Sequence, residues 1–185
     1  MELIGTLKVN MAWIGNGRGY TYGLNTLTQI FSIVGMQIGE TVYCTDHNRV
    51  FTYNGAQWVC DDFVIMVNRS ASTINQWDVV VAGTGGTATE ISCTTTATSG
   101  NPGVVGVAVA TATTGSNVLI AVKGNWKCNV AASTSTGADL TTSTTVGKAQ
   151  NNAGSFSEGV FGYATTSVSG SGTVNCIITT RKELN

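Results

Sequence analysis

Apolar and polar residues alternate along much of the chain, and this pattern predicts strands joined by turns. Three alternating runs come together in the first third, at Thr41–Thr45, Arg49–Tyr53 and Ala56–Cys60. A polar turn at 46–48 separates the first two runs, and Asn54-Gly55 separates the second from the third. Asn-Gly between alternating runs is the strongest short-range hairpin signal. The pattern therefore predicts a three-stranded antiparallel meander.

The lengths of the two turns determine which side chains share a face of this meander. A two-residue turn at Asn54-Gly55 sets Phe51 opposite Trp58, and a three-residue turn at 46–48 sets Tyr43 opposite Phe51. We therefore expect an aromatic row of Tyr43, Phe51 and Trp58 on one face. The opposite face then carries Cys44, Val50 and Val59, so that Cys44 and Cys60 point to opposite sides.

One segment has helical periodicity. Leu27, Ile30, Phe31 and Val34 follow the i, i+3, i+4, i+7 spacing of one apolar helix face. Asn25 or Thr26 can cap its N-terminus, and Gly35 is placed to end it. The sequence predicts a single short helix here.

A weak internal repeat runs through the second part of the chain at an offset of 56 residues. Gly103–Ala108 recurs as Gly159–Ala164, and Val118–Val122 recurs as Val174–Ile178. Each copy has the pattern of two strands joined by a hairpin. We interpret the repeat as pseudo-symmetry within one sandwich or barrel-like domain.

Composition divides the chain near residues 68–72. Most aromatic residues precede this point, whereas Thr, Ser, Gly, Ala and Val dominate after it. The predicted fold class is therefore all-β in two parts. Residues 1–69 form an N-terminal module with an arm, the short helix and the meander, and residues 70–185 form an antiparallel β-sandwich or barrel-like domain.

Charge and hydropathy exclude two classes of partner. The net charge is -1, and the nine Lys and Arg residues are scattered, so the basic surface needed to neutralise many phosphates is missing. The longest apolar run, residues 30–38, is far shorter than the ~20 residues that span a bilayer. We expect a soluble protein, made without export, that binds neither nucleic acid nor membrane.

The five cysteines are an odd number, well spread, with no C-x-x-C pair and a single histidine in the chain. This arrangement favours neither a disulfide framework nor a zinc site. We expect five reduced, mostly buried thiols, and no metal or cofactor.

Residues that could carry catalysis lack the partners they need. His47 lies in a predicted turn without an orienting acid or a nucleophile nearby, which favours a solvated turn histidine. Asp61 and Asp62 are adjacent, so in an extended chain their side chains point to opposite faces. The segment Gly15–Gly19 lacks the Lys-Ser/Thr of a phosphate-binding loop. We expect no enzymatic activity and no small-molecule substrate.

Two stretches carry a resemblance to known families. Ile74–Val81, the two Gly-Val-x-Gly-x-Ala-like strands and their hairpins resemble the head decoration (cement) proteins of tailed bacteriophages over residues 73–180. Residues 39–58, which read Gly-Glu-Thr-Val-Tyr, then Asp-His-Asn, then Tyr-Asn-Gly-Ala-Gln-Trp, resemble a small module of phage fibre and other virion proteins.

The resemblance implies a virion structural protein, assembled in the host cytoplasm and placed on the capsid exterior. Proteins of this kind are homotrimers bound to the major capsid protein, or fibres rooted on the capsid. The leading expectation is a cement protein that clamps neighbouring capsid subunits. The alternative is a head- or tail-fibre module that binds a host receptor or glycan, and copy number per particle separates the two.

Two sets of residues are candidates for contacts with partners. The stretch Trp13–Tyr22 combines mobile glycines with side chains enriched at interfaces, namely Trp13, Arg18, Tyr20 and Tyr22. An ordinary loop packed within its own domain explains that stretch equally well. An exposed aromatic platform on the meander is the second candidate, formed by Tyr43, Phe51, Tyr53 and Trp58.

Overall fold

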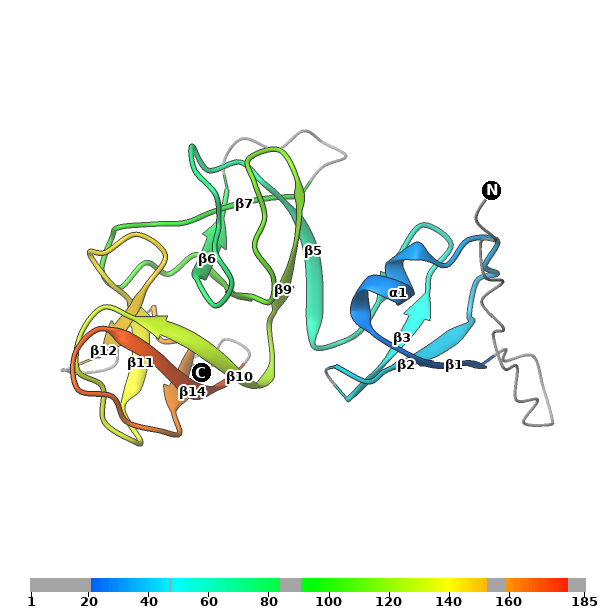
Figure 1. Ribbon diagram of the computed structural model, residues 1–185. Coiled ribbons are helices and arrows are strands. Elements are labelled where there is room, and N and C mark those ends of the chain that lie inside the picture. The colour runs from blue at the N-terminus through cyan, green and yellow to red at the C-terminus, as the bar shows by residue number, and fades with distance from the viewer. Residues whose placement is uncertain (1–20, 47, 84–90, 153–158, 180–185) are drawn as a thin grey trace, which may run out of the picture. The chain divides into compact units, whose positions relative to one another are not determined.

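The computed structural model describes residues 21–46, 48–83, 91–152 and 159–179 (Figure 1). Within these ranges the chain forms fourteen strands and one helix, which confirms the all-β prediction. The chain divides into two compact units, which we call unit 1 (Met1–Cys60) and unit 2 (Asp61–Asn185).

The helix of unit 1, α1 (Leu27–Ser32), begins with a complete capping box. The Thr26 hydroxyl accepts from the backbone N–H of Gln29, and the Gln29 side chain accepts from the backbone N–H of Thr26. Thr26, rather than Asn25, is thus the N-cap. The helix buries Ile30 completely and ends at Ser32, so Val34 lies beyond it and is 87% exposed.

The sheet of unit 1 has the strand order β1-β2-β3-β4. Its strands are β1 (Thr21–Asn25), β2 (Thr41–Cys44), β3 (Arg49–Tyr53) and β4 (Trp58–Val59). The last three form the predicted antiparallel meander, and β1 adds to it in parallel with β2, starting from the pair Thr21 and Thr41. The sequence pattern did not predict β1.

The register of the meander differs from the prediction at both turns. Val42 lies opposite Phe51, and Cys44 lies opposite Arg49, because the first turn holds four residues rather than three. At the second turn Tyr53 pairs with Trp58 rather than with Ala56. The one-residue change at the first turn moves Tyr43 to the face opposite Phe51, because neighbouring residues of a strand point to opposite faces.

Unit 2 contains two closed barrels of five strands each (Figure 1). The strands of barrel 1 are β5 (Phe63–Asn68), β6 (Val79–Ala82), β7 (Ser92–Thr94), β8 (Val104–Ala108) and β9 (Asn117–Ala121). Those of barrel 2 are β10 (Gly124–Val130), β11 (Asp139–Thr142), β12 (Ala149–Asn151), β13 (Gly162–Ala164) and β14 (Gly172–Ile178).

The two barrels share one topology, β5-β7-β6-β8-β9 and β10-β12-β11-β13-β14. The predicted repeat is therefore real, but each copy closes into a barrel of its own instead of contributing half of one domain. Gly106 and Gly162 are equivalent in the two copies. A Cβ on either glycine would collide with a backbone carbonyl of the neighbouring strand, that of Ala121 or Ile177, which explains why both copies have glycine there.

The boundary between the units lies at residues 60/61, earlier than the composition shift at 68–72. The strand β5 precedes that shift, yet it pairs with β7 and β9 and closes barrel 1. Asn68, at the predicted boundary, is fully buried, and its side-chain amide donates to the carbonyl oxygens of Ser72 and Ala112. Composition did not locate the boundary correctly because the apolar residues of β5 are typical of both parts of the chain.

Candidate assembly surfaces

Over the residues that the structure describes, no group of three or more His, Cys, Asp or Glu side chains could hold a metal ion. No helix in the same residues is long and apolar enough to cross a membrane. His47 lies outside the described residues. The backbone carbonyl of Asp62 accepts from the backbone N–H of Val122, so this residue forms part of the edge of barrel 1.

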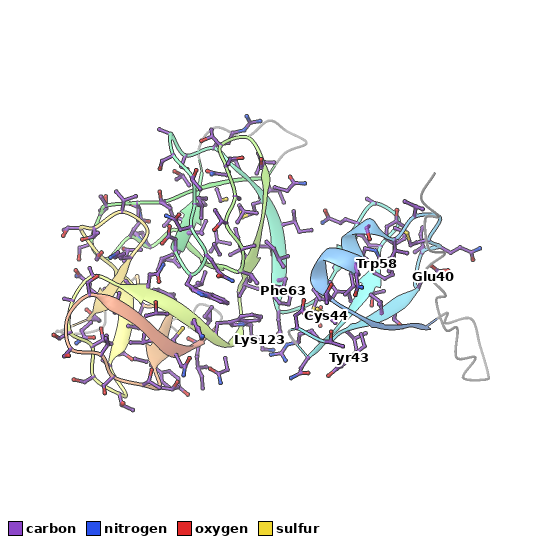
Figure 2. All side chains as sticks on the ribbon, viewed as in Figure 1. Glu40, Tyr43, Cys44, Trp58, Phe63 and Lys123 are labelled. Carbon is purple, nitrogen blue, oxygen red and sulfur yellow. The ribbon has the colours of Figure 1, made fainter. Side chains whose placement is uncertain are left out.

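The predicted aromatic platform does not exist as an exposed surface. Phe51 is completely buried and Trp58 is 3% exposed, and they lie on the core face of the sheet with Val42 and Cys44. The rings of Tyr53 and Trp58 have centroids 5.6 Å apart and are tilted by 60°. The rings of Phe51 and Trp58 are buried in unit 1, where Figure 2 labels Trp58, and cannot stack on a ligand.

Tyr43 and Tyr53 remain partly accessible, but each is held by a local hydrogen bond. The Tyr43 hydroxyl donates to Oδ1 of Asn48 at 2.9 Å, and the Tyr53 hydroxyl donates to the carbonyl oxygen of Gly55 at 3.1 Å. Both bonds tie a tyrosine to the adjoining turn, which indicates a structural role for each.

Most of the predicted partner-binding arm lies outside the described residues. Trp13, Arg18 and Tyr20 lie outside the described residues. The backbone of Tyr22 belongs to β1 and pairs with Val42. The last part of the predicted arm is thus a strand of the sheet.

The turn at residues 75–78 of the first repeat contacts barrel 2. Trp77 has a φ of 70°, where the second repeat has Gly137 with a φ of 84°. The backbone N–H of Trp77 donates to the carbonyl oxygen of Ala108, and that of Gly137 donates to the carbonyl oxygen of Ala164, both at 2.8 Å. A tryptophan in this left-handed conformation is strained, so the surrounding contacts must hold it there.

Those contacts come from barrel 2. The backbone N–H of Asn129 donates to the carbonyl oxygen of Trp77 at 2.9 Å, and the Asn129 amide donates to Oδ1 of the buried Asp78 at 3.0 Å. The other carboxylate oxygen of Asp78 accepts from the backbone and side chain of Asn75. Gly147 lies against this carboxylate, where a Cβ would come within 2.8 Å of it.

A second set of contacts involves the loop at residues 96–101 of barrel 1. The Thr142 hydroxyl of barrel 2 donates to the carbonyl oxygen of Thr98 at 2.7 Å and accepts from the backbone N–H of Asn101 at 2.8 Å. The Gln150 amide donates to the Ser99 hydroxyl at 2.7 Å. The two barrels of unit 2 are therefore fastened together at two places.

The barrels also differ in one outward-facing row of residues. In barrel 1, Phe63, Ala121, Val107 and Val79 are successive cross-strand partners, and all are at most 6% exposed. Barrel 2 covers part of this row. The Trp126 ring packs edge-on against the Phe63 ring, with ring centroids 5.1 Å apart. The backbone N–H of Val79 donates to the carbonyl oxygen of Gly147.

We call the equivalent row of barrel 2 the outer row. It consists of the successive partners Asn125, Ile177, Tyr163 and Asp139. Asn125 and Asp139 are exposed, Ile177 is half-buried and Tyr163 is 38% exposed. The sequence did not single out this surface. The sequence did contain one signal for it: Val79 of the first repeat corresponds to the charged Asp139 of the second, which indicates an exposed position.

Three cysteines lie in the barrel cores as free thiols, namely Cys93, Cys128 and Cys176. Burial raises the pKa of Cys93 to about 11. A hydrogen bond with the Cys176 thiol, together with burial, raises the pKa of Cys128 well above its ordinary value. The raised pKa values hold Cys93 and Cys128 as thiols, which are poor nucleophiles and poor metal ligands.

The predicted reason against a Cys44–Cys60 disulfide is wrong. The observed register places Cys44 on the core face with Trp58. Strand alternation puts Cys60, two residues after Trp58, on that same side. Opposed faces therefore do not separate these two cysteines.

Of three comparisons with known proteins, the one with solved structures found a match, and it bears on the fold alone. No family model matches the chain, and no curated protein matches it. Among solved structures, the chain is similar to the N base of the head fibre gp8.5 of bacteriophage phi29, with a TM-score of 0.51 and 22% sequence identity. The match covers 66% of this chain and 98% of that chain. At this identity the likeness shows a shared all-β architecture.

Proposed function

We propose that this protein is a structural component of a bacteriophage head that binds and stabilises the outer surface of the capsid. The observation that carries the proposal is the fold shared with the base of a phage head fibre.

The same likeness favours a second candidate, a head-fibre base that links a distal receptor-binding part to the capsid. Burial of Phe51 and Trp58 removes the expected glycan-binding surface from unit 1, so receptor or glycan binding would need another surface. Copy number separates the two candidates. Quantitative mass spectrometry of purified particles should give hundreds of copies for a decoration protein and far fewer for a fibre base.

Depletion of the protein tests capsid stabilisation directly. Particles that lack it should release DNA at a lower temperature or lower osmotic stress than complete particles, and purified protein added back should restore them. A version without residues 1–22 should bind the shell less well. Because this deletion removes the start of β1, a version without residues 1–19 is the matched control for folding. Equally robust depleted particles that fail to attach to cells would favour the fibre candidate.

Self-association is part of the proposal. The low content of charged residues, 10%, leaves little repulsion between copies, and closed homo-oligomers are the usual form of such proteins. We expect a homotrimer. Light scattering that shows a stable monomer at micromolar concentration would contradict this part.

The outer row of barrel 2 is the candidate contact surface in unit 2. Tyrosine is enriched where proteins meet, and Tyr163 lies between the apolar Ile177 and the charged Asp139. Tyr163→Ala should weaken binding to the shell or to other copies without changing the unfolding midpoint. Thr144→Ala, at an exposed position between β11 and β12, is the control.

A further inference from the structure

The turn between β3 and β4 exposes an asparagine that is followed by glycine. The pairing of Tyr53 with Trp58 leaves residues 54–57 in this turn, and all of them are exposed. In an Asn-Gly pair, the side-chain amide of the asparagine lies next to the backbone nitrogen of the glycine, which no Cβ shields. The same pair occurs at residues 16–17, outside the described residues. The exposed amide of Asn54 is therefore open to reaction with its own backbone.

Hydrogen bonds hold the Asn54 side chain over the turn. Its Oδ1 accepts from the backbone N–H of Ala56 at 3.0 Å and from that of Gln57 at 2.9 Å. The backbone N–H of Asn54 donates to the carbonyl oxygen of Gln57 at 3.0 Å. Because both donors to Oδ1 follow Asn54 in the chain, its side-chain carbon Cγ is held towards the residues that follow it.

The same two donors favour attack on Cγ. When a nucleophile adds to an amide carbon, negative charge develops on the amide oxygen. Preorganised N–H groups aimed at that oxygen stabilise the charge, as they do in an oxyanion hole. The turn supplies this stabilisation from its own backbone, at Ala56 and Gln57.

The backbone nitrogen of Gly55 can close a succinimide ring with that carbon. Within the described residues its N–H makes no hydrogen bond, so attack does not require breaking one. The φ of Gly55 is 98°, a conformation that favours glycine. A Cβ at this position would come within 2.9 Å of the Ile38 side chain. The fold therefore requires here the residue that leaves the nitrogen least hindered.

We propose that Asn54 deamidates through a succinimide in the folded protein. The Gly55 nitrogen forms a bond to Cγ of Asn54, and the Cγ–Nδ2 bond breaks. The proton of the Gly55 N–H goes to Nδ2, which leaves as ammonia. Water then opens the ring: addition at Cγ gives aspartate, and addition at the backbone carbonyl carbon of residue 54 gives isoaspartate. Either product adds a negative charge to the exposed turn, and neither depends on the proposed role at the capsid.

Isoaspartate changes the length of the turn as well as its charge. In this product the main chain runs through Cβ and Cγ of residue 54, which lengthens the turn that sets Tyr53 opposite Trp58. Trp58 is 3% exposed and belongs to the core. We therefore expect unit 1 to lose stability as isoaspartate accumulates.

Incubation of the purified full chain at mildly alkaline pH, followed by peptide mapping with mass spectrometry, tests the proposal. Asn54 should convert, and enzymatic methylation of isoaspartate should label the peptide that contains it. Asn48, an exposed asparagine that is followed by arginine, should stay unchanged over the same period. Equal conversion at Asn48 would overturn the proposal. So would folded protein that keeps Asn54 intact while the chain unfolded in urea loses it, because the turn would then protect Asn54.

Two variants test the parts of the mechanism separately. Ala56→Pro removes one N–H donor to Oδ1 and should slow conversion of Asn54 roughly tenfold or more, the loss expected for a donor to a developing oxyanion. Conversion at the wild-type rate would refute a role for the backbone donors. If Ala56→Pro does not fold, the comparison of folded and urea-unfolded wild type decides.

Asn54→Gln keeps a side-chain amide but forms a cyclic imide far more slowly. Unit 1 of this variant should hold its unfolding midpoint during an incubation that lowers the midpoint of the wild type. An equal fall in both proteins would show that the loss of stability does not come from residue 54.

Discussion

Individual residues of unit 1 are committed to its core rather than to ligand binding. Phe51 is fully buried, while Tyr43, which is only half-buried, lies on the opposite face of the same sheet. The difference follows from a single extra residue in the turn before β3. At this scale, the register decides whether an aromatic side chain stabilises the fold or stays accessible.

Phe51→Ala should therefore destabilise unit 1 by about 3–5 kcal/mol, the usual cost of truncating a buried phenylalanine. Thermal unfolding followed by circular dichroism should show unit 1 melting earlier while unit 2 melts as in the wild type. Tyr43→Ala is the control and should cost much less. Equal effects of the two substitutions would show that the register is wrong.

Cys93 links stability to pH. Its pKa is about 11 in the folded protein against an ordinary value of 9.0, so between these values the folded state keeps a proton that the unfolded state has lost. This contribution is complete below pH 9 and disappears as pH rises towards 11. Cys93→Val should flatten the fall in urea midpoint across this range, and identical pH profiles would contradict the assignment.

All five cysteines should be reduced in the purified protein. Thiol titration after unfolding without reductant should recover five thiols. Since the register no longer keeps Cys44 and Cys60 on opposite faces, recovery of three would identify that pair as the first one to examine.

At the scale of elements, the turn between Ile74 and β6 is what distinguishes the two repeats. Trp77 and Asp78 replace the Gly137 and Ala138 of the second copy. They supply a carbonyl and a carboxylate to Asn129 of barrel 2. The first repeat therefore makes a polar contact with barrel 2, formed by Trp77, Asp78 and Asn129, which we call the Asp78–Asn129 contact.

Asp78→Ala should leave the amide of Asn129 with one partner fewer in a mostly buried place. We expect unit 2 to lose about 1–3 kcal/mol of unfolding free energy, measured by urea denaturation. Asp139→Ala, at an exposed position of the outer row, should have almost no effect. A similar loss of unfolding free energy in both variants would contradict a stabilising role for the Asp78–Asn129 contact.

The whole molecule is built from a small sheet unit and a pair of barrels, and β5 decides where one ends and the other begins. This strand is the partner of both β7 and β9. Without it barrel 1 cannot close, and its unpaired edges would favour aggregation.

Residues 61–185 should therefore fold alone, whereas residues 70–185, cut at the composition shift, should aggregate or stay partly unfolded. Size-exclusion chromatography and amide proton exchange of the two fragments measure this. If the shorter fragment gives a native-like spectrum, β5 is dispensable and the boundary at 60/61 is misplaced.

The sequence by itself determined the local features: alternation predicted the strands, Thr26 was a candidate cap, and the 56-residue repeat was visible. These depend on neighbouring residues only. Tertiary structure decided the register of the meander, the membership of β5 in barrel 1 and the separate closure of each repeat. It also decided that Val79 is buried whereas the equivalent Asp139 is exposed. Each of these depends on contacts between residues distant in sequence, which neither periodicity nor composition encodes.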